Sequence, residues 1–212
     1  MQRDLLDSLR CPGPHDESWL VAVVHVASGS ELIEAELACP VCGAEYRVAH
    51  GVAHFSDDTV PEHDTWPADD QLLRLAALLG VAESRQPVAL VGRYAASSAP
   101  LASYVAGPQL LVNAAGGRSA VDASRIVVAD KLPLGVDTLA AVAVDAANAS
   151  VSMLESAVRA LRLGGRLVAP ADAPIPAGMR ELARDETEWV AETITRASGL
   201  VELRRRAPES VR

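Results

Sequence analysis

The stretch VALVGRYAASSAPLASYVA at residues 88–106 predicts how most of the chain folds. The four apolar residues 88–91 meet Gly92, and after a polar turn the sequence becomes rich in Ala and Leu, so we expect a helix over 99–106. A buried strand that passes through a glycine turn into a helix is typical of a doubly wound α/β sheet, where ligands usually bind. The turn holds one glycine, whereas a nucleotide cradle normally needs two or three. The stretch therefore predicts an architecture but no activity.

Further apolar runs follow this stretch, at 109–112, 126–129, 139–144 and 166–169. Strands covered by helices on both faces are apolar almost continuously, so these runs predict a parallel sheet. We expect a helix over 152–163, because Ser152 and Glu155 form a capping box and Gly164 and Gly165 follow its end. The predicted fold class is therefore α/β.

Composition excludes several classes of function. The 212 residues carry a net charge of −9, which argues against nucleic acid as a partner because phosphate binding needs clustered Lys and Arg. No apolar run reaches the length of about 18 residues that a membrane span needs. The first residues, MQRDLLDSLRC, hold Arg and Asp where a signal peptide has an apolar core. Three cysteines cannot form a closed set of disulfides, so we expect a cytoplasmic protein.

The cysteines indicate a metal site. Cys39-Pro-Val-Cys42 is a C-x-x-C knuckle, and two thiolates at this spacing can bind one tetrahedral zinc ion. Upstream, Cys11 is followed by His15, which can complete a Cys3His site. Asp16 or a water molecule remains an alternative fourth ligand, and a decayed site with buried cysteines remains an alternative to zinc.

The region around these ligands predicts a small β module. We expect strands at 19–26 and 33–37 and a hairpin formed by 46–48 and 52–55. The order LLDSLRCP, strands, ACPVCGAEYRV and HGVAHF resembles the small zinc-ribbon activator subunits of transfer-RNA and translation-factor methyltransferases, over residues 4–55. The chain departs from that pattern at Pro14, where the family has a ligand, and at Arg47, where it has a proline. The resemblance implies a protein partner, an active methyltransferase, because the relatives activate such enzymes by covering apolar surface.

A second resemblance covers residues 85–170. The segment ADKLPLGVDTLAAVAVDAANASVSMLESAVRALRLGGRLVAP resembles the second half of class I S-adenosylmethionine-dependent methyltransferases, and LRLGGRLV is its strongest part. These residues shape strands and perform no chemistry. The resemblance therefore implies a truncated, Rossmann-like sheet of the class I methyltransferase type.

The cofactor contacts that this family uses are changed. Leu90 replaces an acidic residue, Tyr94 and Ala96 replace two glycines, and Asn113 stands where an acidic residue grips the ribose. Asp130 lies near the position that contacts adenine. The changed first loop, the neutral amide of Asn113 and the short offset of Asp130 from Leu132-Pro133 make three weakened contacts, which predict that S-adenosylmethionine does not bind tightly. If the Tyr94 ring fills the cofactor's place, the enzyme hypothesis weakens; if it points to solvent beside an open cleft, that hypothesis recovers.

The remaining segments are a linker and a tail. The acidic residues over 57–70 predict a solvated linker; the alternative is a cation site that includes His63. We then expect a helix from Asp69 to Leu79 that covers the sheet and ends at Gly80. In the tail, 179–184 and 188–194 predict a hairpin, with a helix over 187–197 as the alternative. A last strand over 200–203 and a basic triplet, Arg204-Arg205-Arg206, follow.

The sequence thus predicts a zinc-ribbon-like module (1–56), an acidic linker with a covering helix (57–84) and a methyltransferase-like α/β domain (85–212). No nucleophile elbow, Walker motif or α/β-domain histidine supplies catalytic chemistry, so we expect no catalytic residue and name no cofactor-binding residue. The leading hypothesis is a non-catalytic, zinc-binding pseudoenzyme that acts as a binding or regulatory partner. The alternatives are an active S-adenosylmethionine-dependent methyltransferase with a divergent cofactor loop, and a protein whose α/β pocket holds another small ligand.

Overall fold

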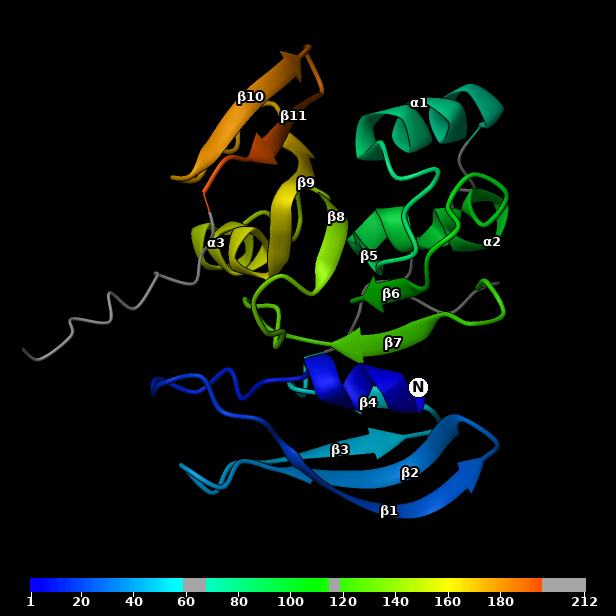
Figure 1. Ribbon diagram of the computed structural model, residues 1–212, viewed down its shortest axis with the longest axis vertical. Helices are drawn as coiled ribbons and strands as arrows, with labels where there is room; N and C mark the ends of the chain where they lie inside the picture. Colours follow the sequence, from blue (N-terminus) through cyan, green and yellow to red (C-terminus); the bar gives the residue numbers. More distant parts are fainter. Residues whose placement is uncertain (59–67, 115–118, 196–212) are drawn as a thin grey trace, which may run out of the picture.

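A computed structural model describes residues 1–58, 68–114 and 119–195, and a single mixed sheet of eleven strands runs through them (Figure 1). The strands are β1 (Val21–Ser28), β2 (Glu31–Ala38), β3 (Glu45–Ala49), β4 (Val52–His54), β5 (Val88–Val91), β6 (Gln109–Val112), β7 (Ser124–Val127), β8 (Leu139–Val144), β9 (Leu161–Pro170), β10 (Met179–Arg184) and β11 (Glu188–Thr193). The helices are the 3-10 helices η1 (Arg3–Ser8) and η2 (Gly92–Ser97) and the α-helices α1 (Asp69–Leu79), α2 (Ser98–Leu101) and α3 (Val151–Ala160).

The centre of the sheet confirms the predicted α/β class. Its strands lie in the order β7-β6-β5-β8-β9 and are parallel, which is the order 3-2-1-4-5 of a doubly wound sheet. β11 pairs antiparallel with β9, and β10 pairs antiparallel with β11. The tail is therefore the predicted hairpin, and the alternative helix over 187–197 is wrong. The strand order reverses at β5 and β8, whose carboxyl ends lie side by side.

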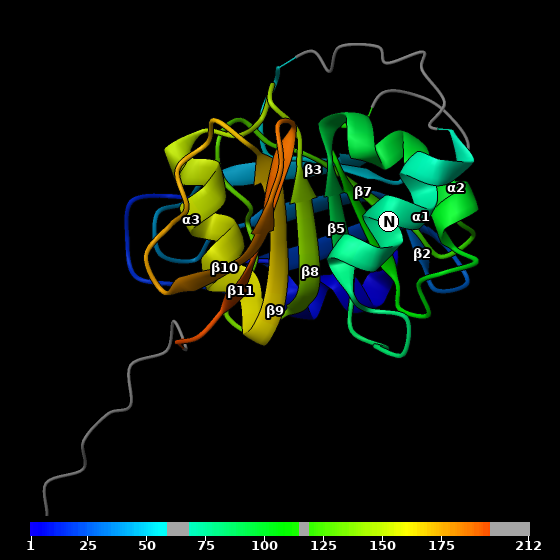
Figure 2. The same cartoon turned by 90° about the horizontal axis from the view of Figure 1, so that it is seen from above.

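Helices cover both faces of this central sheet (Figure 2). On one face α1, α2 and η2 pack over Val88 and Leu90, and on the other face α3 lies in the same core as Ala89 and Val91. Because successive residues of a strand point to opposite faces, the apolar run in β5 serves both cores. The predicted helix over 69–79 is confirmed, and it ends at Gly80 in the left-handed conformation.

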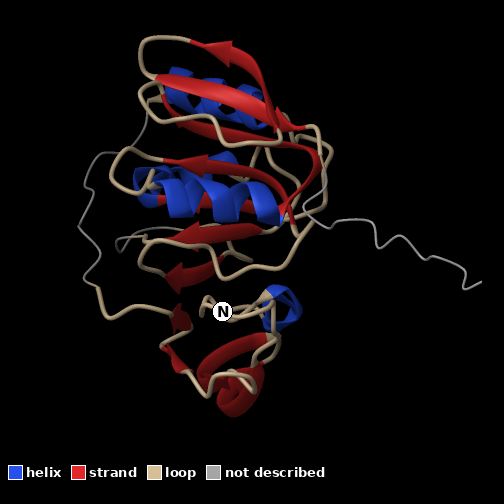
Figure 3. Ribbon diagram, turned by 90° about the vertical axis from the view of Figure 1, so that its left-hand side faces the viewer, coloured by secondary structure: helices blue, strands red, loops and turns tan. Residues whose placement is uncertain are grey.

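The N-terminal strands continue the same sheet (Figure 3). β4 runs parallel to β7, and the Phe55 backbone N–H donates to the Val127 carbonyl at 2.8 Å. The residue after η1, Leu9, is fully buried and bridges to Leu134 of the α/β half. One core therefore contains residues from both sides of position 56, the predicted end of the zinc-ribbon-like module. The domain boundaries remain a prediction.

Two predicted helices are wrong in extent. In place of a helix over 99–106, η2 leads into the four-residue α2. Pro100 is tolerated only near the start of a helix, so the helix cannot begin much earlier than α2 does. The residues after Leu101 include the weak helix formers Ser103 and Val105, which do not favour extending it. α3 ends at Ala160 and not at 163, because the chain becomes extended at Leu161 and enters β9.

The cap of α3 also differs from the prediction. The Ser150 hydroxyl accepts from the Met153 backbone N–H, so Ser150 and not Ser152 caps the helix. Several predictions lie outside the described residues: the cation site through His63, the strand over 200–203 and the triplet Arg204-Arg205-Arg206. No described helix is long and apolar enough to cross a membrane.

Candidate metal centre and the carboxyl ends of the sheet

The four predicted metal ligands lie together. Cys11 and His15 come from the loop that follows η1, and Cys39 and Cys42 come from the turn between β2 and β3. Their Sγ and imidazole nitrogen atoms all lie within 4.8 Å of one another. Two segments more than twenty residues apart therefore bring three sulfur ligands and one nitrogen ligand to one point.

The separations match a tetrahedral zinc ion. Cys11 Sγ lies 3.7 Å from Cys42 Sγ, and Cys39 Sγ lies 3.4 Å from His15 Nε2. Bonds of about 2.3 Å to sulfur and about 2.0 Å to nitrogen place the ligands of a tetrahedral ion roughly 3.5–3.8 Å apart. The donor set fits zinc, and these two separations match the tetrahedral values, while the four ligand atoms together lie within 4.8 Å of one another.

Neighbouring backbone groups orient the ligands. His15 Nδ1 lies 2.6 Å from the Asp16 carbonyl and donates to it, which leaves Nε2 with its lone pair toward Cys39. Gly43 has φ +71° and its N–H donates to the Cys39 carbonyl at 2.9 Å, which closes the tight turn of the knuckle.

The thiol of Cys39 is poised to ionise. Burial opposes the thiolate, but hydrogen bonds from the backbone of Cys42 and Val41 outweigh burial and lower the pKa of Cys39 to about 6. The thiolate is the form that binds metal, so this ligand is available at neutral pH.

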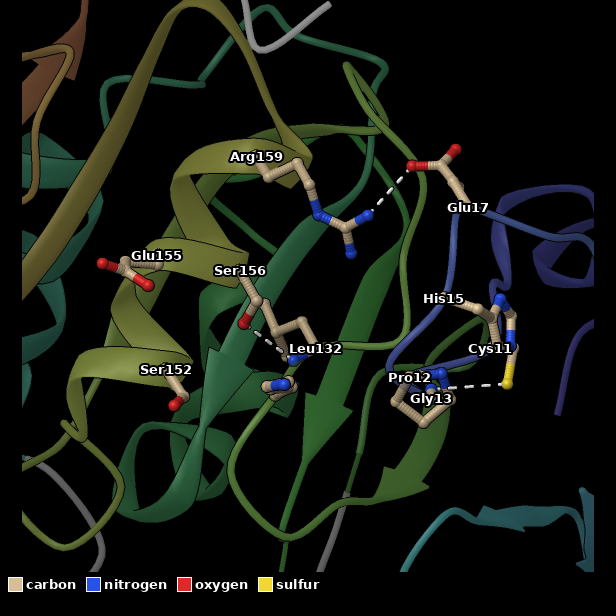
Figure 4. A pocket seen from close by; sticks show the side chains of 11 residues that line it. Cys11, Pro12, Gly13, His15, Glu17, Leu132, Ser152, Glu155, Ser156 and Arg159 are labelled. Atoms are coloured by element: carbon tan, nitrogen blue, oxygen red, sulfur yellow. Dashed lines mark hydrogen bonds and ion pairs between the residues drawn. The ribbon is translucent and has the colours of Figure 1, made fainter. Parts of the chain in front are cut away.

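A pocket of about 380 Å³ lies between the loop of Cys11 and His15 and one face of α3 (Figure 4). Arg159 on α3 reaches across it to Glu17, at 2.9 Å, and the Ser156 hydroxyl accepts from the Leu132 N–H at 2.9 Å. This pocket was not predicted, because its residues are spread over three distant segments with no common motif.

The carboxyl ends of β5, β6 and β8 are linked by their own side chains. Asn113, after β6, donates to Asn148 at 2.8 Å, and Asn148 donates to Asp145, after β8, at 2.7 Å. The other carboxylate oxygen of Asp145 accepts from the Arg93 backbone N–H at 2.8 Å. A Cβ placed on Gly92 would collide with this carboxylate. The single glycine of the loop thus makes room for Asp145, a residue of the same chain.

Tyr94 is directed toward β11. Its hydroxyl donates to Glu188 Oε2 at 2.7 Å, and the Arg74 guanidinium of α1 holds the other Glu188 oxygen at 2.7 Å. Burial, together with the hydrogen bond to Glu188, raises the pKa of Tyr94 to about 12. Among the other predicted cofactor positions, Leu90 is fully buried and Asp130 is exposed. The sequence argument missed Asp145, Asn148 and Glu188; a polar residue directly after a buried strand was the available signal for Asp145.

His15 is the predicted ligand that most needs a direct test, because Asp16 or a water molecule is the alternative. We expect His15→Ala to weaken zinc binding by at least about tenfold, because one of four ligands is lost. The control is Asp16→Ala, which keeps the backbone carbonyl that orients His15 and is expected to bind zinc like the natural chain. Competition with a chromophoric chelator measures both. Unchanged affinity in His15→Ala, or a loss in Asp16→Ala, would contradict the assignment.

No protein-family model matches the chain, and no curated protein matches it. Solved structures similar to it include geranyl diphosphate methyltransferase in complex with SAM (18% identity, TM-score 0.39, 47% of this chain and 47% of that chain). They also include a tRNA methyltransferase from Aquifex aeolicus (12%, 0.42, 62% and 71%). A third is a candidate hemolysin from Streptococcus thermophilus (11%, 0.43, 74% and 78%). The chain spans about half the length of the first of these. Identities and TM-scores this low assign no activity to it.

Proposed function

We propose that this chain is a non-catalytic, zinc-binding protein with a methyltransferase-like sheet, a pseudoenzyme that acts as a binding or regulatory partner. The observation that carries the proposal is the hydrogen-bonded chain Asn113–Asn148–Asp145 at the carboxyl ends of β6 and β8. In a doubly wound sheet, ligands bind at these ends, close to the point where the strand order reverses.

The polar groups at this point are already engaged. Asn113 Oδ1 accepts from the Val128 N–H at 2.8 Å, so both ends of its amide are used. Asp145 uses one carboxylate oxygen for Asn148 and the other for the backbone of the glycine loop. A cofactor would have to replace these hydrogen bonds, and losing the partners of Asp145, which is buried, is costly, whereas Asn113 and Asn148 are half-buried.

Zinc has a structural role in this proposal. Three thiolates and one imidazole fill all four positions of a tetrahedral ion, whereas catalytic zinc keeps one position for water or substrate. The site ties the loop after η1 to the turn between β2 and β3. Zinc thereby stabilises the N-terminal strands that extend the sheet beyond β7.

The partner in this proposal is a protein, and an active methyltransferase is one candidate. It binds the N-terminal module on a surface other than the one that faces the α/β half. Leu32, Leu37 and Val48 of the N-terminal strands share a core with Ile126 and Val142 of the same chain. The apolar face of the N-terminal strands is thus already covered by the α/β half of the same chain.

A thermal-shift experiment tests the proposal. A ligand present at 100 times its Kd stabilises a protein by about 2.7 kcal/mol, which for a chain of this size raises Tm by roughly 5–10 °C. We therefore expect no rise when about 1 mM S-adenosylmethionine is added to the zinc-loaded chain. A rise of several degrees would favour the alternative, an active methyltransferase with a divergent cofactor loop.

A further inference from the structure

The two edges of the sheet differ in character. At one edge, β10 carries Arg180, Glu181 and Arg184 among its six residues. At the other edge, β1 is VAVVHVAS, eight residues without Asp, Glu, Lys, Arg or Pro. Proteins protect an edge strand with charges or proline, because its unpaired backbone groups are a template for pairing with another chain. β10 is protected in this way, whereas β1 carries neither a charge nor a proline and only its register against β2 shifts, between Val24 and Ala27.

Exposed apolar side chains follow β1. We call the following residues of β1 the β1 patch: Val21 (57% exposed), Val23 (54%), Val24 (41%) and Val26 (49%). Among the described residues β1 pairs with β2 alone, and it lies on the side of the molecule away from the α/β half (Figure 1). A run of exposed β-branched residues on a free edge marks a surface that another strand covers.

We propose that β1 pairs antiparallel with β1 of a second copy of this chain, about a two-fold axis. The partner strand must be uncharged, rich in β-branched residues and free on one side, and β1 itself meets each requirement. A two-fold interface uses the same patch on both subunits. The result is one continuous sheet through two molecules.

Charge favours this symmetric pairing over other contacts between copies. The one titratable side chain of β1 is His25, which lies 3.5 Å from Glu36 of the neighbouring strand β2. No register of β1 against β1 therefore sets two carboxylates or two ammonium groups opposite each other. Pairing of β1 with β10 would instead place apolar residues against Arg180, Glu181 and Arg184 and would continue without closing. The proposed dimer is closed.

Sedimentation velocity of the zinc-loaded chain of 212 residues tests this inference. The contact is one strand wide, so we expect a monomer–dimer equilibrium with a Kd in the micromolar range, visible between about 1 and 200 µM. Val23→Lys sets two lysines close to the two-fold axis and is expected to raise that Kd at least about tenfold. The matched control is Leu182→Lys on β10, a side chain 41% exposed on the opposite edge, which is expected to leave the equilibrium unchanged.

A second variant guards against misfolding of the first. The double variant Val21→Thr with Val23→Thr keeps β-branching while making the patch polar, and its zinc content and circular dichroism report folding. It is also expected to shift the equilibrium toward monomer. A natural chain that stays monomeric throughout, a dimer that survives both β1 variants, or a dimer lost in Leu182→Lys would each overturn the proposal. None of these outcomes depends on whether S-adenosylmethionine binds.

Discussion

Replacing Cys39 with serine is expected to abolish stoichiometric zinc binding and to destabilise the whole chain. Cys39 supplies a thiolate from the knuckle, its Sγ lies 3.4 Å from His15 Nε2, and its lowered pKa keeps it ionised at neutral pH. Zinc binding to such sites contributes folding free energy of order 10 kcal/mol in small zinc modules. We expect the zinc content to fall from about one ion per chain to less than about a tenth of that.

The control for this variant lies in the same knuckle. Val41 is 64% exposed and is not a ligand, so Val41→Ser is expected to retain zinc and Tm. Elemental analysis after gel filtration and a thermal melt give both readouts. A Cys39→Ser chain that keeps a full equivalent of zinc would contradict the metal site.

Leu37→Ala is expected to cost about 2–5 kcal/mol of unfolding free energy, because Leu37 is fully buried and the substitution leaves a cavity. Leu37 lies in β2, yet its core includes residues of β5 and β8. The loss should therefore appear as a fall in Tm of roughly 5–15 °C in a single cooperative transition. Leu182→Ala, at an exposed position of β10, is expected to change stability by less than about 0.5 kcal/mol.

Scanning calorimetry distinguishes this account from one with independent domains. If residues 1–56 and 85–212 unfolded separately, the Leu37→Ala scan would split into two transitions, and only one would move. That result would contradict the shared core.

Three of the five central strands were predictable to the residue, whereas β7 lies at Ser124–Val127 and not at 126–129, and β9 at Leu161–Pro170 and not at 166–169. β5, β6 and β8 occupy 88–91, 109–112 and 139–144, the ranges of the apolar runs, because a strand buried on both faces needs apolar residues throughout. The pair Cys39 and Cys42 was predictable as part of a candidate metal cluster for a related reason, since the C-x-x-C spacing is a local consequence of tetrahedral geometry.

Features that depend on distant contacts were not predictable. Nothing local to Val52–His54 indicates that this short strand pairs with β7 seventy residues later, so the continuous sheet could not be seen. The extension of β9 back to Leu161 depends on its bridge to Leu139, which replaces the last helical turn. Likewise, Glu188 lies at the carboxyl ends of the sheet because it accepts hydrogen bonds from Tyr94 and Arg74. Both residues are remote from Glu188 in the sequence, so this contact could not be predicted.

The central claim is that Asn113, Asn148 and Asp145 close the carboxyl ends of the sheet to the cofactor. Isothermal titration calorimetry of the zinc-loaded chain with S-adenosylmethionine tests it most directly. The account predicts no saturable heat, with any Kd above about 1 mM. Saturable binding at micromolar concentration with one site per chain would contradict it.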